Sequence, residues 1–164
     1  MRQNSMRQNG GDISAYTIKR LVSGEAHRFA ALTQLFAEVF GDDSYSVAKP
    51  GADYLEELLQ KQHIIPLVAE VNGNVVAGLV AYVLDKFEQA RSEIYIYDLA
   101  VHEAYRRRGI ARNLILELKK HAQKAGAWVI YVQADKDEAD LPARQLYASL
   151  GEQEDVFHYD IAVN

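Results

Sequence analysis

The segment from Asp98 to Ala111 carries the residue types best suited to chemistry. A strand-like run, EIYIYDLAV (93–101), leads to the turn RRRGIA (106–111), after which a helical pattern starts. The first N–H groups of a helix have no carbonyl partner within the helix, and the helix dipole adds partial positive charge there. Gly109 permits a positive φ, and arginine guanidinium groups match phosphate oxygens. This context favours pyrophosphate binding, whereas three arginines alone are more typical of a solvated surface.

Asp98 is unusual because the alternation of the strand places it on the face of Ile94, Ile96 and Ala100. A carboxylate among apolar residues must be paired, hydrogen-bonded or functional. A structural hydrogen bond to nearby backbone and a role in catalysis are equally good interpretations. The same alternation predicts Tyr97 on the other face.

Other reaction types lack their residues. The sequence contains no Cys and no GxSxG motif, and its five His residues are dispersed without an HExxH pattern. Acyl-enzyme chemistry is therefore not expected, and we predict no catalytic metal.

Composition predicts one soluble domain. The 164 residues, 49% hydrophobic and 25% charged, fit a single globular domain, which we place at 14–164. Residues 1–13 are polar, repeat Met-Arg-Gln-Asn and predict a disordered extension. The net charge of −5 has the wrong sign for nucleic acid or an anionic membrane. No apolar run is long enough to span a bilayer, so we expect a cytoplasmic protein.

The remaining pattern alternates between strand and helix periods. We expect a strand at 15–21, a helix capped by Ser23, and a second helix from Asp53 with a capping box to Glu56. A loop at 41–51 separates these two helices. The run 63–84 predicts a hairpin that turns at Asn72-Gly73.

The second half of the chain continues in the same way. A helix from Ile110 ends near Gly126, a buried strand follows at 127–134, and a short helix has Pro142 in its first turn. A last strand is expected at 156–163. This order predicts an α/β fold with a mixed sheet.

The motif RRRGIA matches the acetyl-CoA signature [Gln/Arg]-x-x-Gly-x-[Gly/Ala], so the sequence resembles the GNAT acetyltransferase superfamily over nearly all of residues 15–163. More narrowly, the stretches 86–111 and 128–135 look like the aminoglycoside 3-N-acetyltransferases of the gentamicin-resistance type. The resemblance implies a GNAT-like mixed sheet with splayed central parallel strands flanked by helices. Members of the superfamily often form homodimers, although no pattern in this sequence requires one.

The resemblance also implies a binding site for acetyl-CoA. The main chain of the strand would hold the thioester and pantetheine, and the turn would wrap the pyrophosphate. The implied cofactor-binding residues are Leu99, Ala100, Val101, Arg106, Arg107, Arg108, Gly109, Ile110 and Ala111.

Two catalytic residues are implied by the same resemblance. Tyr147 matches the general acid that protonates the departing thiolate, although it also fits an amphipathic helix stripe with Leu146 and Leu150. Asp98 matches a carboxylate beside the acceptor amine, which it could orient or deprotonate. Tyr97, Asp98, Asp43 and Asp135 are the expected contacts of a polycationic aminoglycoside.

Three functions remain open at this point. The first is acetylation of the 3-amino group of aminoglycosides, which would confer antibiotic resistance. The second is acetylation of a polyamine, another small amine or a protein N-terminus. The third is a non-catalytic acyl-CoA-binding module.

Overall fold

The computed structural model describes residues 15–41 and 49–163. Residues up to Tyr131 form one compact unit, and residues from Val132 form a second, so each unit is described by itself. The single domain expected at 14–164 stays a prediction. The expected extension at 1–13, and most of the expected loop at 41–51, lie outside the described residues.

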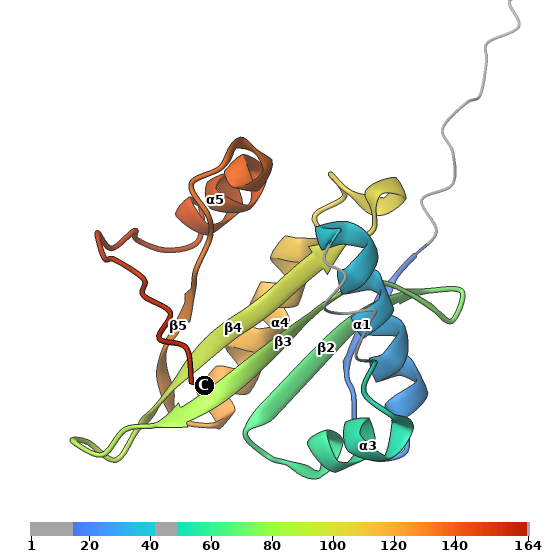
Figure 1. Cartoon of the computed structure of the whole chain (residues 1–164), viewed down its shortest axis with the longest axis horizontal. Coiled ribbons are helices and arrows are strands. Elements are labelled where there is room, and N and C mark those ends of the chain that lie inside the picture. Colours follow the sequence, from blue (N-terminus) through green and yellow to red (C-terminus); the bar gives the residue numbers. More distant parts are fainter. Residues whose placement is uncertain (1–14, 42–48, 164) are drawn as a thin grey trace, which may run out of the picture. The chain divides into compact units, whose positions relative to one another are not determined.

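A five-stranded mixed sheet organises the first unit (Figure 1). The order β1–β2–β3–β4–β5 comprises Thr17–Arg20, Ile64–Val71, Asn74–Asp85, Ser92–Val101 and Ala127–Val132. Strands β1 to β4 pair antiparallel. The indole N–H of Trp128 donates a hydrogen bond to Glu93, and further along both strands Tyr131 stacks on Tyr95. Residue numbers in β4 and β5 therefore increase in the same direction. Strand β5 is therefore parallel to β4, which confirms the predicted mixed sheet.

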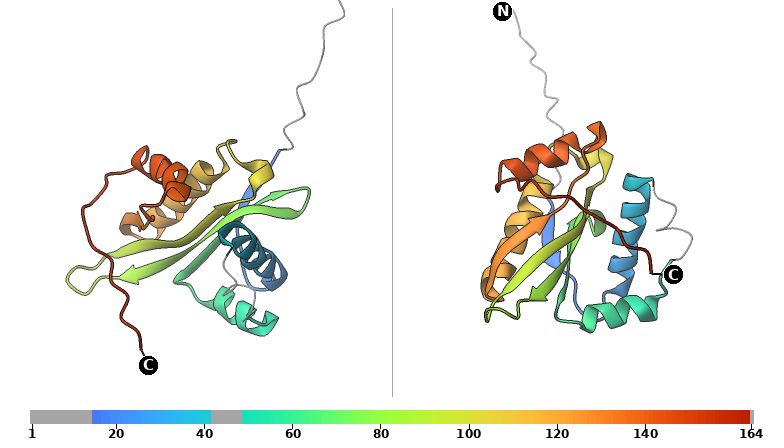
Figure 2. Two further views of the ribbon diagram at one scale, coloured as in Figure 1. Left: turned by 45° about the horizontal axis from the view of Figure 1, so that its top comes forward. Right: turned by 60° about the vertical axis from the view of Figure 1, so that its left-hand side comes forward.

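Helices cover both faces of this sheet (Figure 2). Helices α1 (Ala26–Phe40) and α3 (Ala52–Gln60) contact each other and lie on one face, and α4 (Ile110–Lys124) lies on the opposite face. A short 3-10 helix, η1 (Glu103–Tyr105), connects β4 to α4. The second unit holds η2 (Glu138–Asp140) and α5 (Leu141–Ala148).

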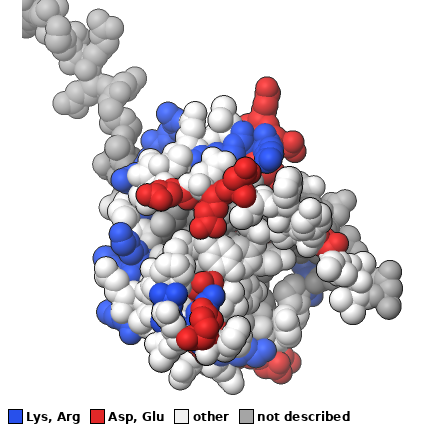
Figure 3. All heavy atoms as spheres, turned by 90° about the vertical axis from the view of Figure 1, so that its left-hand side faces the viewer, with Lys and Arg blue, Asp and Glu red and all other residues white. Residues whose placement is uncertain are grey.

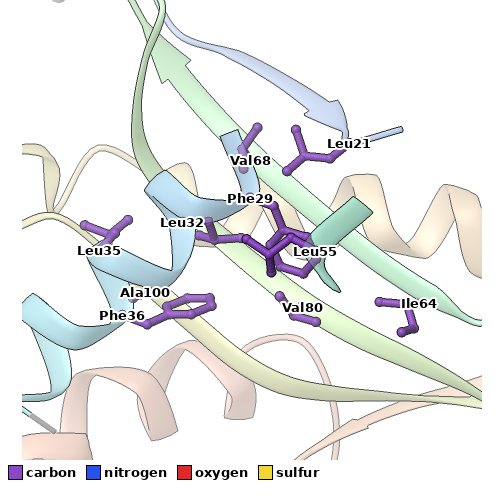
Figure 4. Close-up of a cluster of buried hydrophobic side chains, with 10 residues drawn as sticks. All are labelled: Leu21, Phe29, Leu32, Leu35, Phe36, Leu55, Ile64, Val68, Val80 and Ala100. Carbon is purple, nitrogen blue, oxygen red and sulfur yellow. The ribbon is translucent and has the colours of Figure 1, made fainter. Parts of the chain in front are cut away.

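The core on the α1 face follows from the apolar stripe of that helix. Phe29, Leu32 and Phe36 are at most 3% exposed and point toward the sheet, where they pack in one cluster with Val80 and Ala100 (Figure 4). Burying a side chain of this size contributes about 1.5–3 kcal/mol. On the other face, the predicted stripe of α4 is confirmed by the buried residues Ile110, Leu114, Leu118 and Ala122.

The predicted hairpin turn is confirmed. Asn72 and Gly73 separate β2 from β3 and have φ values of 50° and 80°. Positive φ at both central residues is the requirement of a type I′ turn, whose twist matches that of the flanking strands.

A β-bulge in β4 overturns the predicted face of Asp98. Val80 lies opposite Asp98 and Ala81 lies opposite Ile96, so no residue of β3 lies opposite Tyr97 in the strand register. The extra residue reverses the alternation. Asp98 therefore shares its face with Ala100 and the α1 core, and not with Ile94 and Ile96 as expected.

Both predicted helix caps are wrong for a tertiary reason. Helix α1 starts at Ala26 after Glu25, and neither α1 nor α3 has a side-chain cap. Glu56 instead accepts hydrogen bonds from Ser23 and from the Gly24 N–H, the latter at 2.8 Å. A carboxylate on α3 thus accepts the hydrogen bonds of the residues that precede α1.

Two strand predictions also need correction. Strand β5 is not buried, because it is the last strand in the sheet order and leaves Trp128 56% exposed. The strand expected at 156–163 is absent, and its apolar residues are exposed. A strand needs a ladder partner, and among its described residues the second unit contains only the last residue of β5.

None of the helices among the described residues is long and apolar enough to cross a membrane.

The packing of α1 on the sheet generates a stability prediction at Gly78. A Cβ at this position would lie 2.5 Å from Leu32 Cδ1 and 2.6 Å from the Leu67 carbonyl oxygen. The backbone oxygen cannot move without breaking the β2–β3 ladder, so we expect Gly78→Ala to lower the free energy of unfolding by roughly 1–3 kcal/mol. Urea unfolding monitored by circular dichroism measures this change.

Gly151→Ala is the control for Gly78→Ala. A Cβ at Gly151 would meet only the Tyr147 carbonyl oxygen at 4.0 Å, and its φ is not positive. We expect no loss of stability there. Equal effects of the two substitutions would contradict the packing argument.

Candidate active site

The turn between β4 and α4, from Arg106 to Ala111, is named the cradle because it leads into the backbone N–H groups at the start of the helix. Gly109 has a φ of 76°, as the sequence predicted, and Arg107 has a φ of 63°, which it did not. Arg106 before them is extended, so the turn leads directly into the N-terminus of the helix, where an anion is favoured. A Cβ built on Gly109 meets nothing within 4 Å, so the space above this residue is open.

Helix α4 adds its N-terminus to the cradle. Its first backbone bond runs from the Asn113 N–H to the Gly109 carbonyl at 3.0 Å, and no side chain caps the helix. The N–H groups of the first turn therefore have no carbonyl partner within the helix. Ile110 is only 2% exposed and anchors this end of the helix in the core, while Ala111 next to it is small.

The three arginines of the turn differ in their surroundings. Arg106 Nε donates to the Val101 carbonyl at 3.2 Å, which folds this side chain back over the end of β4. The Arg108 guanidinium lies 5.2 Å from the ring of Tyr105, and Arg107 is exposed. All three place a guanidinium group in this turn, and guanidinium groups match phosphate oxygens.

The second half of β4 extends beyond its parallel neighbour. The Glu93–Trp128 and Tyr95–Tyr131 contacts set the direction, and β5 ends at Val132. The stretch Asp98–Val101, which includes Leu99 and Ala100, thus keeps its antiparallel partner β3 but extends past the end of β5. This edge therefore has the form of one arm of a splayed pair, and its Val101 carbonyl accepts the hydrogen bond from Arg106.

A pocket of about 390 Å³ lies where α1 and α3 meet β3 and β4. Tyr97 and Asp98 both line it, because the bulge turns them toward the same face. The sequence had placed them on opposite faces. Tyr54 on α3 and Tyr82 on β3 also line the pocket and were missed, since nothing local marks either tyrosine as functional.

The phenols of this region are held neutral. Burial, followed by Tyr97, Tyr54 and Asp98, raises the pKa of Tyr82. Burial is also the largest cause for Tyr95, whose pKa is raised further by Tyr97, Tyr131 and Asp98. The Asp98 charge therefore acts on two tyrosine side chains, both of which stay protonated at neutral pH.

Charge on the surface is mixed. On the face shown in Figure 3, acidic and basic side chains lie interspersed, so this face carries no extended field of one sign.

The second unit carries Tyr147 on α5. Burial, and then the neighbouring Asp140 carboxylate, raises the pKa of Tyr147 to about 12. Asp140 also accepts a hydrogen bond from the Asp135 N–H at 2.9 Å, and Arg144 donates to the Asp135 carbonyl. The main chain of Asp135 thus has a structural role, and substrate contact by its carboxylate stays a prediction.

Asp43 lies outside the described residues. Among the residues that the structure does describe, no group of three or more His, Asp or Glu side chains could hold a metal ion.

Comparison with known proteins identifies the class. The chain matches the model of the acetyltransferase (GNAT) family over residues 29–151. It is 46% identical to the aminoglycoside acetyltransferase HMB0005 from an uncultured soil metagenomic sample, covering 92% of this chain and 99% of that chain with a TM-score of 0.89. A comparison with curated proteins finds no match.

Two further structures are similar. The aminoglycoside acetyltransferase meta-AAC0020, from an uncultured soil metagenomic sample and in complex with sisomicin, is 30% identical, with coverages of 91% and 97% and a TM-score of 0.84. A ribosomal-protein-alanine N-acetyltransferase from Brucella melitensis biovar Abortus is 27% identical, with coverages of 92% and 100% and a TM-score of 0.71.

The protein belongs to the GNAT acetyltransferase family, whose enzymes use acetyl-CoA. The predicted superfamily and fold are confirmed. The narrower resemblance to 3-N-acetyltransferases stays a prediction.

The cradle generates a prediction with a matched control. Gly109 and Gly126 flank α4, have φ values of 76° and 68°, and leave the space of a Cβ open. Alanine at either position costs about 1–2 kcal/mol of left-handed strain. Gly109→Ala adds its methyl group within the cradle, whereas Gly126→Ala adds one at the far end of α4. We therefore expect only Gly109→Ala to weaken coenzyme A binding, by about tenfold or more.

Isothermal titration calorimetry with coenzyme A measures this difference, and melting temperatures check that both variants fold. If Gly126→Ala weakened binding as much as Gly109→Ala, the effect would be strain alone, and the cradle would not be the diphosphate site.

Proposed function

We propose that this protein transfers an acetyl group from acetyl-CoA to the 3-amino group of the 2-deoxystreptamine ring of an aminoglycoside. The carrying observation is the 46% identity, over nearly the full length of both chains, to a protein described as an aminoglycoside acetyltransferase. The sisomicin complex of the 30% identical protein supports the same substrate class. The 3-position rests on the sequence resemblance of residues 86–111 and 128–135.

The pocket beside β4 supports an amine acceptor. Among the described residues of the lining, Asp98 carries the only carboxyl group and the others are aromatic, apolar or uncharged; Asp98 also directly precedes Leu99. In the proposed complex the cradle from Arg106 to Ala111 holds the diphosphate, and the main chain of Leu99 and Val101 holds the thioester arm. The acceptor amine would then lie next to the thioester carbonyl, which supplies proximity.

The proposed reaction assigns one task to each group. The amine nitrogen forms a bond to the thioester carbonyl carbon, the C–S bond breaks, nitrogen loses a proton and sulfur gains one. The Leu99 N–H stabilises the developing oxyanion. Asp98 orients the amine or accepts its proton, and Tyr147 provides the proton for sulfur.

The raised pKa of Tyr147 constrains its role. Proton transfer from a phenol of pKa about 12 to a thiolate of pKa ~8.5 is uphill by about 5 kcal/mol. Tyr147 therefore acts first as a hydrogen-bond donor to the developing charge on sulfur. Because the shift is upward, the donating form persists throughout the neutral and moderately alkaline range.

A protein N-terminus is the second candidate acceptor. It is favoured by the 27% identity to a protein described as a ribosomal-protein-alanine N-acetyltransferase. Spermidine represents the polyamine alternative, and absence of any transfer would leave only the acyl-CoA-binding module.

The first functional prediction concerns the product. We expect the purified protein to consume acetyl-CoA with gentamicin and to acetylate the 3-amino nitrogen, as mapped by mass spectrometry and NMR. We expect lower kcat/KM with spermidine and with a peptide that begins with alanine. Modification of a different nitrogen would refute the positional assignment, and an unmodified drug would refute the substrate class.

The second concerns Tyr147→Phe, which removes the donor but keeps the ring. We expect kcat to fall ~10²–10⁴-fold. Since the hydroxyl stays protonated until pH approaches a pKa of about 12, the ratio of wild-type to variant kcat should be constant from about pH 6 to 10. A ratio that declined within this range, or an unchanged kcat, would rule out this role.

A further inference from the structure

The pocket beside β4 is walled by aromatic rings from three elements. Tyr54 comes from α3, Tyr82 from β3, and Tyr97 from the bulge of β4. The rings of Tyr82 and Tyr97 lie 5.9 Å apart at 81°, so they meet at nearly a right angle. Tyr82 and Tyr97 thus meet edge to face, and Tyr54 lines the same pocket.

The pocket also contains a carboxylate. Among the described residues of its lining, Asp98 carries the only carboxyl group, and none is Lys, Arg or His. The raised pKa of Tyr82 keeps its ring a neutral phenol. Aromatic faces and a carboxylate attract an ammonium group, and quaternary ammonium ligands are recognised in this way by aromatic cages.

Such a cage is unsuited to the nitrogen that reacts. A negative, aromatic environment favours the charged form of an amine and raises the pKa of that amine. An ammonium group has no lone pair, so the nitrogen that attacks a thioester must be neutral. The group held in the cage and the group that is acetylated therefore differ.

We infer that Tyr54, Tyr82, Tyr97 and Asp98 form a cage for a second, non-reacting ammonium group of the acceptor. The inference rests on the proposed function in that the acceptor is an amine. It makes Tyr54 and Tyr82 determinants of selectivity for acceptors with two or more amino groups. It also assigns to Asp98 the orienting role, by charge pairing with the second amine, and leaves proton acceptance to another group.

A matched pair of acceptors tests the inference. One is 2-deoxystreptamine, which has two amines on one ring, and the other is the same ring with its 1-amine replaced by hydroxyl. We expect wild-type kcat/KM to favour the diamine by about tenfold or more, mainly through KM. Tyr54→Leu and Tyr82→Leu should reduce this preference, whereas Tyr82→Phe, which keeps the ring, should preserve it.

Tyr131→Leu is the matched control. Tyr131 stacks on Tyr95 at 4.9 Å and is partly exposed, but it does not line the pocket. We expect the Tyr131→Leu variant to prefer the diamine as strongly as the wild type does. The cage is overturned if the wild type shows no preference for the diamine, or if the pocket variants slow both acceptors equally.

Tetramethylammonium separates failure of the cage from failure of the proposed function. This cation has no transferable proton and cannot be acetylated, so NMR titration measures binding without turnover. We expect the chemical shifts of Tyr54 and Tyr82 to move in the wild type, and the chemical shift of Tyr54 to stay unchanged in Tyr82→Leu. If tetramethylammonium binds but no aminoglycoside is acetylated, the proposed substrate class fails and the cage stands. If an aminoglycoside is acetylated but tetramethylammonium does not bind, the cage fails and the proposed substrate class stands.

Discussion

The bulge at Tyr97 is the constraint on which the site depends. Strand β4 is packed on both faces, so a strict period of two would keep Asp98 on the face of Ile94 and Ile96, both at most 2% exposed. A carboxylate there would lose its hydration without a partner of opposite charge. The inserted residue reverses the faces, so Asp98 and Tyr97 reach the pocket while Ile96 stays in the core.

Strand β4 also leads into the cradle. Beyond the bulge, Ala100 packs under α1, and beyond Val101 the chain turns through η1 to Gly109. Ile110, which directly follows the left-handed residues Arg107 and Gly109, fixes the start of α4 in the core. Strain of this kind persists where the surrounding structure determines it. A turn that is already formed lowers the ordering cost of binding a ligand.

Features that depend on local chemistry could be predicted from the sequence. The turn at Asn72-Gly73 has a conformation that few other residue pairs adopt, and the stripe of α4 has the period of a helix packed on one side. The positive φ of Gly109 belongs to this group, because Gly at a helix start is conformationally free. The family motif lies in such local features, so the family could also be recognised.

The sequence alone thus determined most of the helices and strands, the glycine-containing turn before α4 and the class of protein, because each depends on residues close together in the chain. Tertiary structure decided the face of Asp98, the participation of Tyr54 and Tyr82 in the pocket, and the use of Glu56 to hold Gly24. A bulge depends on the register with a neighbouring strand, and a carboxylate that could cap its own helix can instead satisfy a distant N–H. These alternatives have similar local energies, and only the packing of the whole sheet and its helices selects between them.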